Sequence, residues 1–450
     1  MGSRMNRSED LAKLDVQSLW HPLRQHRGIA SDLPRQIVSA EGVYLEDADG
    51  ARLLDGVAGI WCVNVGYGRE ELADVAREQM LRLPYLPGTF THAPGAELAG
   101  KLTEMLGYAS KVFFTNSGSE ANEAAFKVAR QYHAQTGSPG RYKIIARYRG
   151  YHGNTLGALS ATGQAERKLG YGPFAPGFVH IDAPDSYRIT HDCADQLERA
   201  IEREGSSTVA AFIMEPIIAG GGVLIPPDDY LPRVREICDR HGVLLIVDEV
   251  VTGFGRTGST FAHKHASIEP DMLTLGKGIA SGYQPLAAMV AKQEIFEAFD
   301  GEPGGLSHFR HINTYGAHPV ATAVGLRNLE ILQSEGLYER AAKTGDALLT
   351  RLRALEEHPH VGEVRGRGLL IGIELVADKE TRAPIAAAEG GRVVARCARD
   401  GVLIGRTANT TPGHDNVLML APPYVISEDE TDILASTLEN AIREELSGTA

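Results

Sequence analysis

Residues 111–132, KVFFTNSGSEANEAAFKVARQY, join a short apolar run to an amphipathic helical pattern through a polar connection. The same change from apolar to polar residues recurs where YKIIA meets RYRGYHG, AAFIM meets EP, VLLIV meets DEV and DMLTL meets GKG. Short apolar runs that alternate with helices are typical of a mostly parallel sheet covered by helices. The sequence therefore predicts an α/β fold.

Outside this core, hydrophobic periodicity predicts the remaining elements. Helices are expected at 70–83, 95–106 and 120–133, and a hairpin is expected at 41–55, around the turn Asp-Ala-Asp-Gly. The alternating segment 364–376 predicts one strand, followed by helical stretches near 391–399 and 428–444, which together indicate a smaller α+β unit. We expect three parts: an N-terminal segment, 1–62, that contributes to the small domain; a large domain, 63–325; and a C-terminal small domain, 326–450.

Composition narrows the classes of partner. The 450 residues include 58 acidic and 45 basic side chains, mixed along the chain, with a net charge of -13. This balance argues against nucleic acid and anionic membrane as partners. No apolar run approaches the roughly twenty residues that cross a bilayer, and the chain start lacks the apolar core of a secretory signal. Cysteines are few and scattered, which favours a reducing cytoplasm; they are Cys62, Cys193, Cys238 and Cys397.

The polar residues after the apolar runs are the candidate site. In open parallel sheets, ligands bind beyond the carboxyl ends of the strands, so these five connections are expected to line one site. Asp248 follows five apolar residues, and an ionised carboxylate at a buried strand end needs a cationic partner. Either an internal salt bridge or the protonated ring nitrogen of a cofactor would meet that need. Lys277 lies between two glycines, where partial burial would lower its pKa and make the amine nucleophilic.

Two further connections suggest contacts with a phosphorylated, planar ligand. Ser117, Gly118 and Ser119 precede a helix, whose N-terminus binds anions such as phosphate. A simple serine cap of the helix would give the same pattern. Tyr151, in the segment RGYHG, could lie flat against a planar ring, although a buried tyrosine with a satisfied hydroxyl is an equal alternative.

Other motif matches do not support a nucleotide or metal enzyme. The segment 253–258, GFGRTG, satisfies the dinucleotide pattern, but no apolar helix follows it, and the P-loop lysine is missing. The 16 histidines form no HExxH motif and no paired Cys and His spacing. We therefore expect no catalytic metal.

Several of these segments, in order, resemble the class III, fold type I aminotransferases that use pyridoxal 5'-phosphate (PLP), and among them the pyruvate-dependent omega-transaminases. The resemblance runs from about Trp20 to the last helix, through GVAGIWCVNVGYGR, NSGSEANEAAFKVAR, GYHG, MEPIIAGGGV, VDEVVTGFGRTG, LGKGIASGYQPL, NTYGAHPV and VRGRGLLIGIEL. It implies a large domain with a mostly parallel sheet flanked by helices, and a smaller α+β domain.

The resemblance also implies a role for each candidate residue. Lys277 would bond covalently to PLP, and Asp248 would pair with the ring nitrogen. Trp61 would bound the substrate pocket, and Arg406 would swing toward a substrate carboxylate. The remaining cofactor contacts implied are Ser117, Gly118 and Ser119 at the phosphate, Tyr151 and Val250 on the two ring faces, Glu215 and His152 around the ring, and Asn313 and Thr314 from a neighbouring subunit. A homodimer with shared active sites is therefore implied, with its pairing into tetramers left open.

The implied reaction moves an amino group from an amine or omega-amino acid to pyruvate in a ping-pong sequence, giving alanine and an aldehyde or ketone. The segments 19–26 and 59–74 are somewhat similar to the taurine:pyruvate branch. Residues 217–219, Ile-Ile-Ala, replace the Ile-Gln-Gly frequent in the family, so the donor stays open. The alternatives within the family are a taurine-specific transaminase, an aminomutase and a decarboxylating transaminase. Outside it they are a nucleotide-binding oxidoreductase that uses 253–258 and a noncatalytic relative that only binds.

Overall fold

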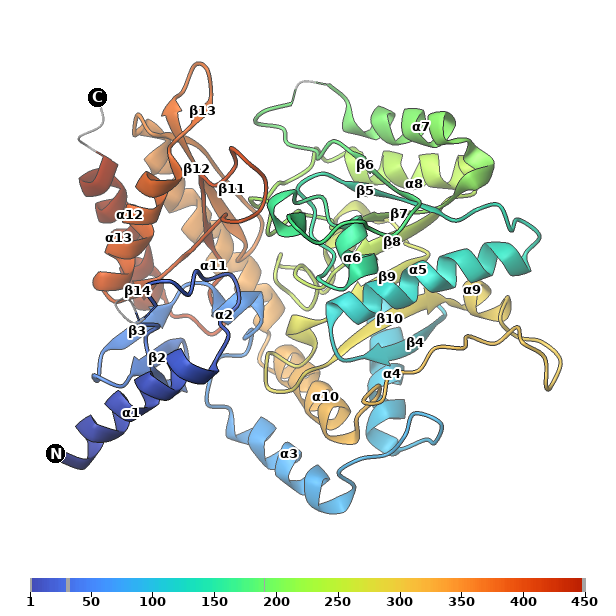
Figure 1. The fold of residues 1–450 in the computed structure, drawn as a ribbon, viewed down its shortest axis with the longest axis horizontal. Helices are drawn as coiled ribbons and strands as arrows, with labels where there is room; N and C mark the ends of the chain where they lie inside the picture. Colours follow the sequence, from blue (N-terminus) through green and yellow to red (C-terminus); the bar gives the residue numbers. More distant parts are fainter. Residues whose placement is uncertain (1, 30–32, 190, 447–450) are drawn as a thin grey trace.

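The computed structural model describes residues 2–29, 33–189 and 191–446 (Figure 1). Its centre is a seven-stranded sheet in the order β4-β10-β9-β8-β7-β5-β6. Only β10 runs against its neighbours, so the predicted mostly parallel sheet is confirmed. The strands are β4 Ser110–Thr115, β5 Lys143–Arg147, β6 Phe178–Ile181, β7 Val209–Met214, β8 Leu244–Asp248, β9 Met272–Leu275 and β10 Ala287–Lys292.

Helices cover both faces of this sheet, which explains why the strands read as unbroken apolar runs. Leu244 and Ile246 of β8 pack with the apolar face of α5, whereas Leu245 and Val247 pack with α7 and α8. The helices of this part are α3 Glu70–Arg82, α4 Ala93–Leu106, α5 Gly118–Gln135, α6 Leu156–Ala161, α7 Cys193–Glu204, α8 Tyr230–His241 and α9 Gln293–Glu297. The helices predicted at 70–83, 95–106 and 120–133 are confirmed as α3, α4 and α5.

A second part combines both ends of the chain beside the large sheet (Figure 1). The predicted hairpin is confirmed by β2 and β3, and β3 also pairs in parallel with β14 from the C-terminal region. Its strands are β1 Ile37–Glu41, β2 Tyr44–Asp47, β3 Arg52–Asp55, β11 Val361–Gly366, β12 Ile371–Asp378, β13 Ala383–Pro384, β14 Val402–Leu403, β15 Gly405–Arg406 and β16 Val417–Leu420. The domain limits 62 and 325 stay predictions.

The remaining helices include four that the sequence analysis did not predict, namely α1, α2, α10 and α11. They are α1 Gly2–Ser18, α2 Ala58–Trp61, α10 Pro319–Ser334, α11 Leu337–Leu352, α12 Ala387–Arg399 and α13 Glu428–Leu446. Five short 3-10 turns complete the elements, at Glu166–Lys168 (η1), Ser206–Thr208 (η2), Ala262–Ala266 (η3), Lys277–Ile279 (η4) and Arg353–Glu357 (η5). Among the helices described, none combines the length and apolar character that a bilayer crossing requires.

The expectation of one alternating strand across 364–376 is wrong, because the chain turns back on itself there. β11 ends at Gly366 and pairs antiparallel with β12. Between them Gly368 takes a φ of 56°, and the N–H of Arg367 donates to the carbonyl of Leu370 at 3.1 Å. Alternation of apolar residues continues through the turn, so periodicity alone could not reveal it.

A buried carboxylate joins the two parts. Glu374 on β12 is fully buried and accepts hydrogen bonds from Arg188, which precedes α7, and from Arg365 on β11, each at 2.6 Å. Burial raises the pKa of Glu374, but the charges of Arg365 and Arg188 outweigh it and lower the pKa to about 2. The stability that this group contributes is therefore complete above its ordinary pKa of 4.5 and is lost as the pH falls toward 2.

We expect Glu374→Gln to lower the free energy of unfolding at pH 7 by about 3 kcal/mol, because half-buried Arg188 loses its anionic partner and buried Arg365 keeps only Glu363. The same variant should show a flatter loss of stability between pH 5 and pH 3 than the wild type. Urea unfolding followed by circular dichroism across that pH range measures both effects. A pH dependence identical to the wild type would contradict the assignment.

Candidate active site

The predicted site residues follow strands that end at one edge of the large sheet. β4, β5, β7, β8 and β9 all run in the same direction, so their carboxyl ends lie along the same edge. The ends of these five strands and the connections after them carry the site candidates. In strand order these are the phosphate-binding residues 117–119, Tyr151, Glu215, Asp248 and Lys277. The topology thus brings together chemistry that is spread over more than 150 residues of sequence.

Asp248 ends β8 on the same face as Leu244 and Ile246, which is the face covered by α5. Its Oδ2 accepts hydrogen bonds from Nδ2 of Asn122 and Nδ1 of His152, both at 2.9 Å, and its Oδ1 accepts the N–H of Val250 at 3.1 Å. Within the described residues, no lysine or arginine forms an ion pair with Asp248, and its one such partner is His152. The carboxylate is therefore fixed in orientation but free to compensate a further positive charge.

Lys277 follows β9 with a left-handed φ of 42°, a strained conformation for a residue with a side chain. Burial lowers the pKa of its amine, and the carboxylates of Asp248 and Glu215 oppose that shift without reversing it. A lowered pKa increases the fraction of neutral, nucleophilic amine near pH 7. The amine makes no hydrogen bond with any residue that the structure describes, and it lies 5.7 Å from the ring centroid of Trp61.

The helix cap expected at 117–119 is present. Ser117 is the N-cap of α5, and its Oγ accepts the N–H of Glu120 at 3.3 Å. The Oγ of Ser119 donates to Oδ1 of Asn154 at 3.1 Å. The N-terminus of α5, a helix of 18 residues, points its backbone N–H groups at this edge of the sheet. Capping and anion binding are therefore compatible here.

Val250 connects this helix end to the lysine strand. A Cβ built on Gly118 would come within 2.9 Å of Cγ2 of Val250, and one on Gly276 would come within 3.3 Å of its Cγ1. The side chain of Val250 therefore fills the space between the two glycines. Glycine at position 118 is the residue that permits this close approach.

The opposite side of this cluster of site residues is formed by Tyr151, His152 and Glu215. The Oε1 of Glu215 accepts the N–H of Tyr151, and its Oε2 accepts the N–H of Ala219, both at 3.0 Å. Burial raises the pKa of Glu215, and the nearby His152 opposes that rise. Burial also raises the pKa of Tyr151, so its hydroxyl stays protonated near neutral pH.

Asn122 is a site residue that the sequence analysis missed. It is buried, and its Nδ2 donates both to Asp248 and to the carbonyl of His152, at 2.7 Å. One signal was available, because Asn122 lies four residues after Gly118 and therefore one turn further on the same helix face. A buried amide on an otherwise alanine-rich face indicates a polar partner.

Three predicted residues lie apart from this group. Arg406 donates to the carbonyl of Asp415, and no described hydrogen bond connects it with Asp248 or Lys277. Asn313 and Thr314 lie in the half-buried to exposed segment before α10, where the carbonyl of Thr314 accepts the hydroxyl of Tyr85 at 3.1 Å. Their expected contact across a subunit boundary stays a prediction.

The segment 253–258 has a structural role. Arg256 within it is fully buried and donates to the carbonyls of Leu369 and Pro422 and to Oδ1 of Asn64. The next element is the short turn η3, so the segment does not open a helix as a dinucleotide loop does. In the described ranges, no group of three His, Cys, Asp or Glu side chains could hold a metal ion.

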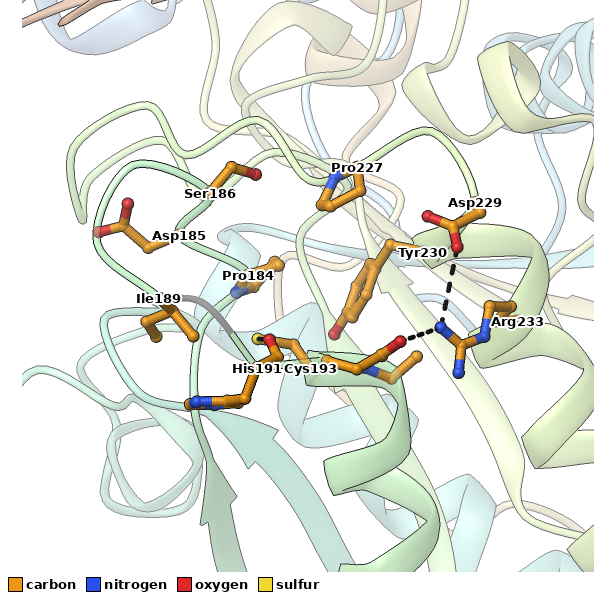
Figure 2. A pocket seen from close by; sticks show the side chains of 12 residues that line it. Pro184, Asp185, Ser186, Ile189, His191, Cys193, Pro227, Asp229, Tyr230 and Arg233 are labelled. Atoms are coloured by element: carbon orange, nitrogen blue, oxygen red, sulfur yellow. Dashed lines mark hydrogen bonds and ion pairs between the residues drawn. The ribbon is translucent and has the colours of Figure 1, made fainter.

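A surface cavity lies away from these residues. It is formed between the start of α7 and the start of α8, where Arg233 pairs with Asp192 and Asp229 (Figure 2). None of the predicted cofactor or substrate residues lines it. Figure 2 shows Tyr230 and Cys193 facing one another across the cavity.

Comparison with known proteins agrees with this geometry. Residues 29–442 match the family described as Aminotransferase class-III. An uncharacterized aminotransferase of Bacillus subtilis (strain 168), YhxA, is 49% identical over 444 residues, which are 98% of this chain and 98% of the relative. A taurine–pyruvate aminotransferase of Rhodobacter capsulatus is 42% identical over 439 residues, 95% of this chain and 96% of the relative.

A solved structure shows the same fold. The (S)-enantioselective omega-transaminase of Thermomicrobium roseum superposes with a TM-score of 0.91 at 42% identity, covering 97% of this chain and 99% of that one. The chain belongs to the class III aminotransferases, a family of PLP-dependent enzymes.

The residues present fit PLP. The N-terminus of α5, with Gly118 closely approached by Val250, suits a phosphate group. Asp248, held by three hydrogen bonds and unpaired with any described lysine or arginine, suits a protonated ring nitrogen. The amine of Lys277 is unengaged and has a lowered pKa, as covalent attachment to an aldehyde requires.

We expect Gly118→Ala to weaken PLP binding by about tenfold, because the added methyl group would collide with Val250 and displace the helix end. Titration of the PLP-free protein with PLP, followed by absorbance, measures the dissociation constant. Gly100→Ala in α4 is the matched control, since its Cβ would meet nothing within 4 Å. Equal affinity of both variants would show that the contact with Val250 does not shape the phosphate site.

Proposed function

We propose that this protein is a PLP-dependent transaminase that moves an amino group from an amine or omega-amino acid to pyruvate, giving alanine and an aldehyde or ketone. The observation that carries the proposal is the convergence of a depressed-pKa lysine, a fixed carboxylate and a helix N-terminus at one sheet edge. Pyruvate as acceptor is supported by the name of the taurine–pyruvate relative at 42% identity.

When bound, PLP supplies an electron sink that stabilises negative charge at the substrate carbon. Asp248 would keep the ring nitrogen protonated, and Asn122 and His152 would hold the carboxylate in place for that purpose. Tyr151 and Val250 would enclose the ring, and Ser117, Gly118 and Ser119 would bind the phosphate. Glu215 is fixed by the backbone of Tyr151 and would line the remaining side of the ring.

Lys277 would move the proton. Its neutral amine can remove a proton from the substrate carbon and return it to the cofactor side, acting as general base and then as general acid. Trp61 lies beside this amine and would limit the substrate pocket. Arg406, which is held only by a backbone carbonyl, is free to move toward the carboxylate of pyruvate. The carbonyl product leaves before pyruvate enters, so the kinetics are ping-pong.

We also propose a cytoplasmic homodimer with shared active sites. The segment with Asn313 and Thr314 carries exposed apolar side chains, with Ile312 at 68% and Tyr315 at 61% exposure. Such side chains beside polar ones are typical of a subunit interface. The four cysteines are free, as in proteins of a reducing compartment.

The proposal is tested by the absorption spectrum of the purified, PLP-loaded protein. Taurine, beta-alanine and 1-phenylethylamine are added separately, followed by pyruvate. A band lost with one donor and restored by pyruvate, with alanine formed in equal amount, is the expected result. A protein that takes up no PLP, or that forms no alanine with any amine, would overturn the proposal.

We expect Lys277→Ala to reduce turnover by at least about 10³-fold, because it removes both the covalent attachment point and the proton carrier. Alanine formation measures turnover, and circular dichroism confirms the fold. Lys101→Ala is the matched control, because Lys101 pairs with Glu104 on α4. Turnover at the wild-type rate in the Lys277 variant would refute the role of Lys277.

We expect Arg406→Ala to slow the half-reaction with pyruvate by about 100-fold and the half-reaction with 1-phenylethylamine much less, because only pyruvate has a carboxylate. Stopped-flow absorbance resolves the two half-reactions. Equal losses in both would remove Arg406 from this role.

A further inference from the structure

Arg167 is a half-buried arginine without an acidic partner. It lies in the turn η1, Glu166–Lys168, and its Nε donates to Oε1 of Gln164 at 3.1 Å. Gln164 is buried and is held in turn by the carbonyl of Arg149 at 3.0 Å. No described carboxylate forms an ion pair with Arg167, although acidic side chains outnumber basic ones, 58 to 45. Its charge is therefore oriented by a neutral amide and left uncompensated.

A series of close contacts links this guanidinium group to the substrate-side residues. Its Cζ is 5.5 Å from the ring centroid of Tyr151. A Cβ built on Gly220 would lie 3.6 Å both from Nε2 of Gln164 and from Cη2 of Trp61. The ring of Trp61 in turn lies 5.7 Å from Nζ of Lys277, so Gln164, Gly220 and Trp61 connect Arg167 with the amine.

An oriented guanidinium with free terminal N–H groups matches the oxygens of a carboxylate or sulfonate in a two-point contact. We propose that Arg167 binds the acidic group of the amino donor and so selects omega-amino acids, carboxylic or sulfonic, over uncharged amines. This inference rests on the proposed transaminase function and adds the donor class to it.

The proposed role of Arg406 is compatible with a second cation at Arg167. The two arginines lie on segments joined by a hydrogen bond, from the N–H of Glu166 to the carbonyl of Thr410 at 2.9 Å. Arg406 ends the short strand β15 and its side chain is held by one backbone carbonyl, whereas Arg167 is oriented by a buried side chain. A fixed guanidinium group suits the acid group of one donor class. A movable guanidinium group suits the carboxylate of the acceptor, which occupies the site in alternation with the donor.

The test compares donors in the PLP-loaded enzyme with pyruvate as acceptor. Arg167→Leu should lower kcat/KM for taurine and beta-alanine by about 100-fold, and for 1-phenylethylamine by less than about threefold. Arg167→Lys keeps the charge but loses the two-point contact, so a loss of about tenfold with the acidic donors is expected. Lys168→Met is the matched control, since the adjacent Lys168 donates to the carbonyl of Ser160 at 3.2 Å.

The comparison of donors shows whether Arg167 binds a sulfonate, a carboxylate or both. Loss with taurine alone identifies sulfonate as the ligand of Arg167, loss with beta-alanine alone identifies carboxylate, and loss with both shows shared recognition. Equal loss with all three amines, or an equal selective loss in Lys168→Met, would overturn the proposal.

A second readout separates this inference from the proposed function. Ethanesulfonate and propanoate cannot donate an amino group, and calorimetry measures their binding to the PLP-loaded protein. Weaker binding of at least one of these anions in Arg167→Leu supports the acid site even if no amine is turned over. Unchanged binding of both would overturn the site even if transamination is established.

Discussion

The buried carboxylate of Asp248 is the constraint on which the rest of the site depends. An ionised carboxylate at the end of a fully buried strand loses its hydration, and three hydrogen bonds replace only part of it. Each of those bonds comes from a different connection, so α5, the segment after β5 and the segment after β8 must all meet at one point. The remaining demand for positive charge is what a protonated ring nitrogen would satisfy.

Backbone strain occurs at Lys277 and at residues near it. Lys277, Trp61, Phe254 and Ser281 all have left-handed φ values between 42° and 58°, which side chains rarely adopt. Such residues persist only where the surrounding packing determines their conformation, at a cost of about 1–3 kcal/mol each. Here the packing comes from the large sheet and from the second part together. The surrounding packing therefore fixes these backbone conformations, which favours preorganised catalysis.

Charged side chains are paired with one another at the junction of the two parts, whereas some at the candidate active site are not. Glu374 is surrounded by arginines, so its negative charge is compensated within the protein. At the carboxyl edge of the large sheet, by contrast, Asp248 forms no ion pair with a described lysine or arginine, and Arg167 forms none with a described carboxylate. A structural pair is complete by itself, whereas a binding site keeps charges that its ligands must complete.

The amino-acid sequence by itself determined the α/β class, the polar strand ends and the candidates Lys277 and Asp248, because apolar runs and their abrupt ends are local features. Resemblance between motifs extended this to the cofactor. Tertiary structure alone decided that Asn122 holds Asp248 and that Trp61 lies beside Lys277, because both contacts join residues more than 100 positions apart in sequence. It also decided where the segment 364–376 turns, since alternation continues through the bend and only the pairing of β11 with β12 reveals it.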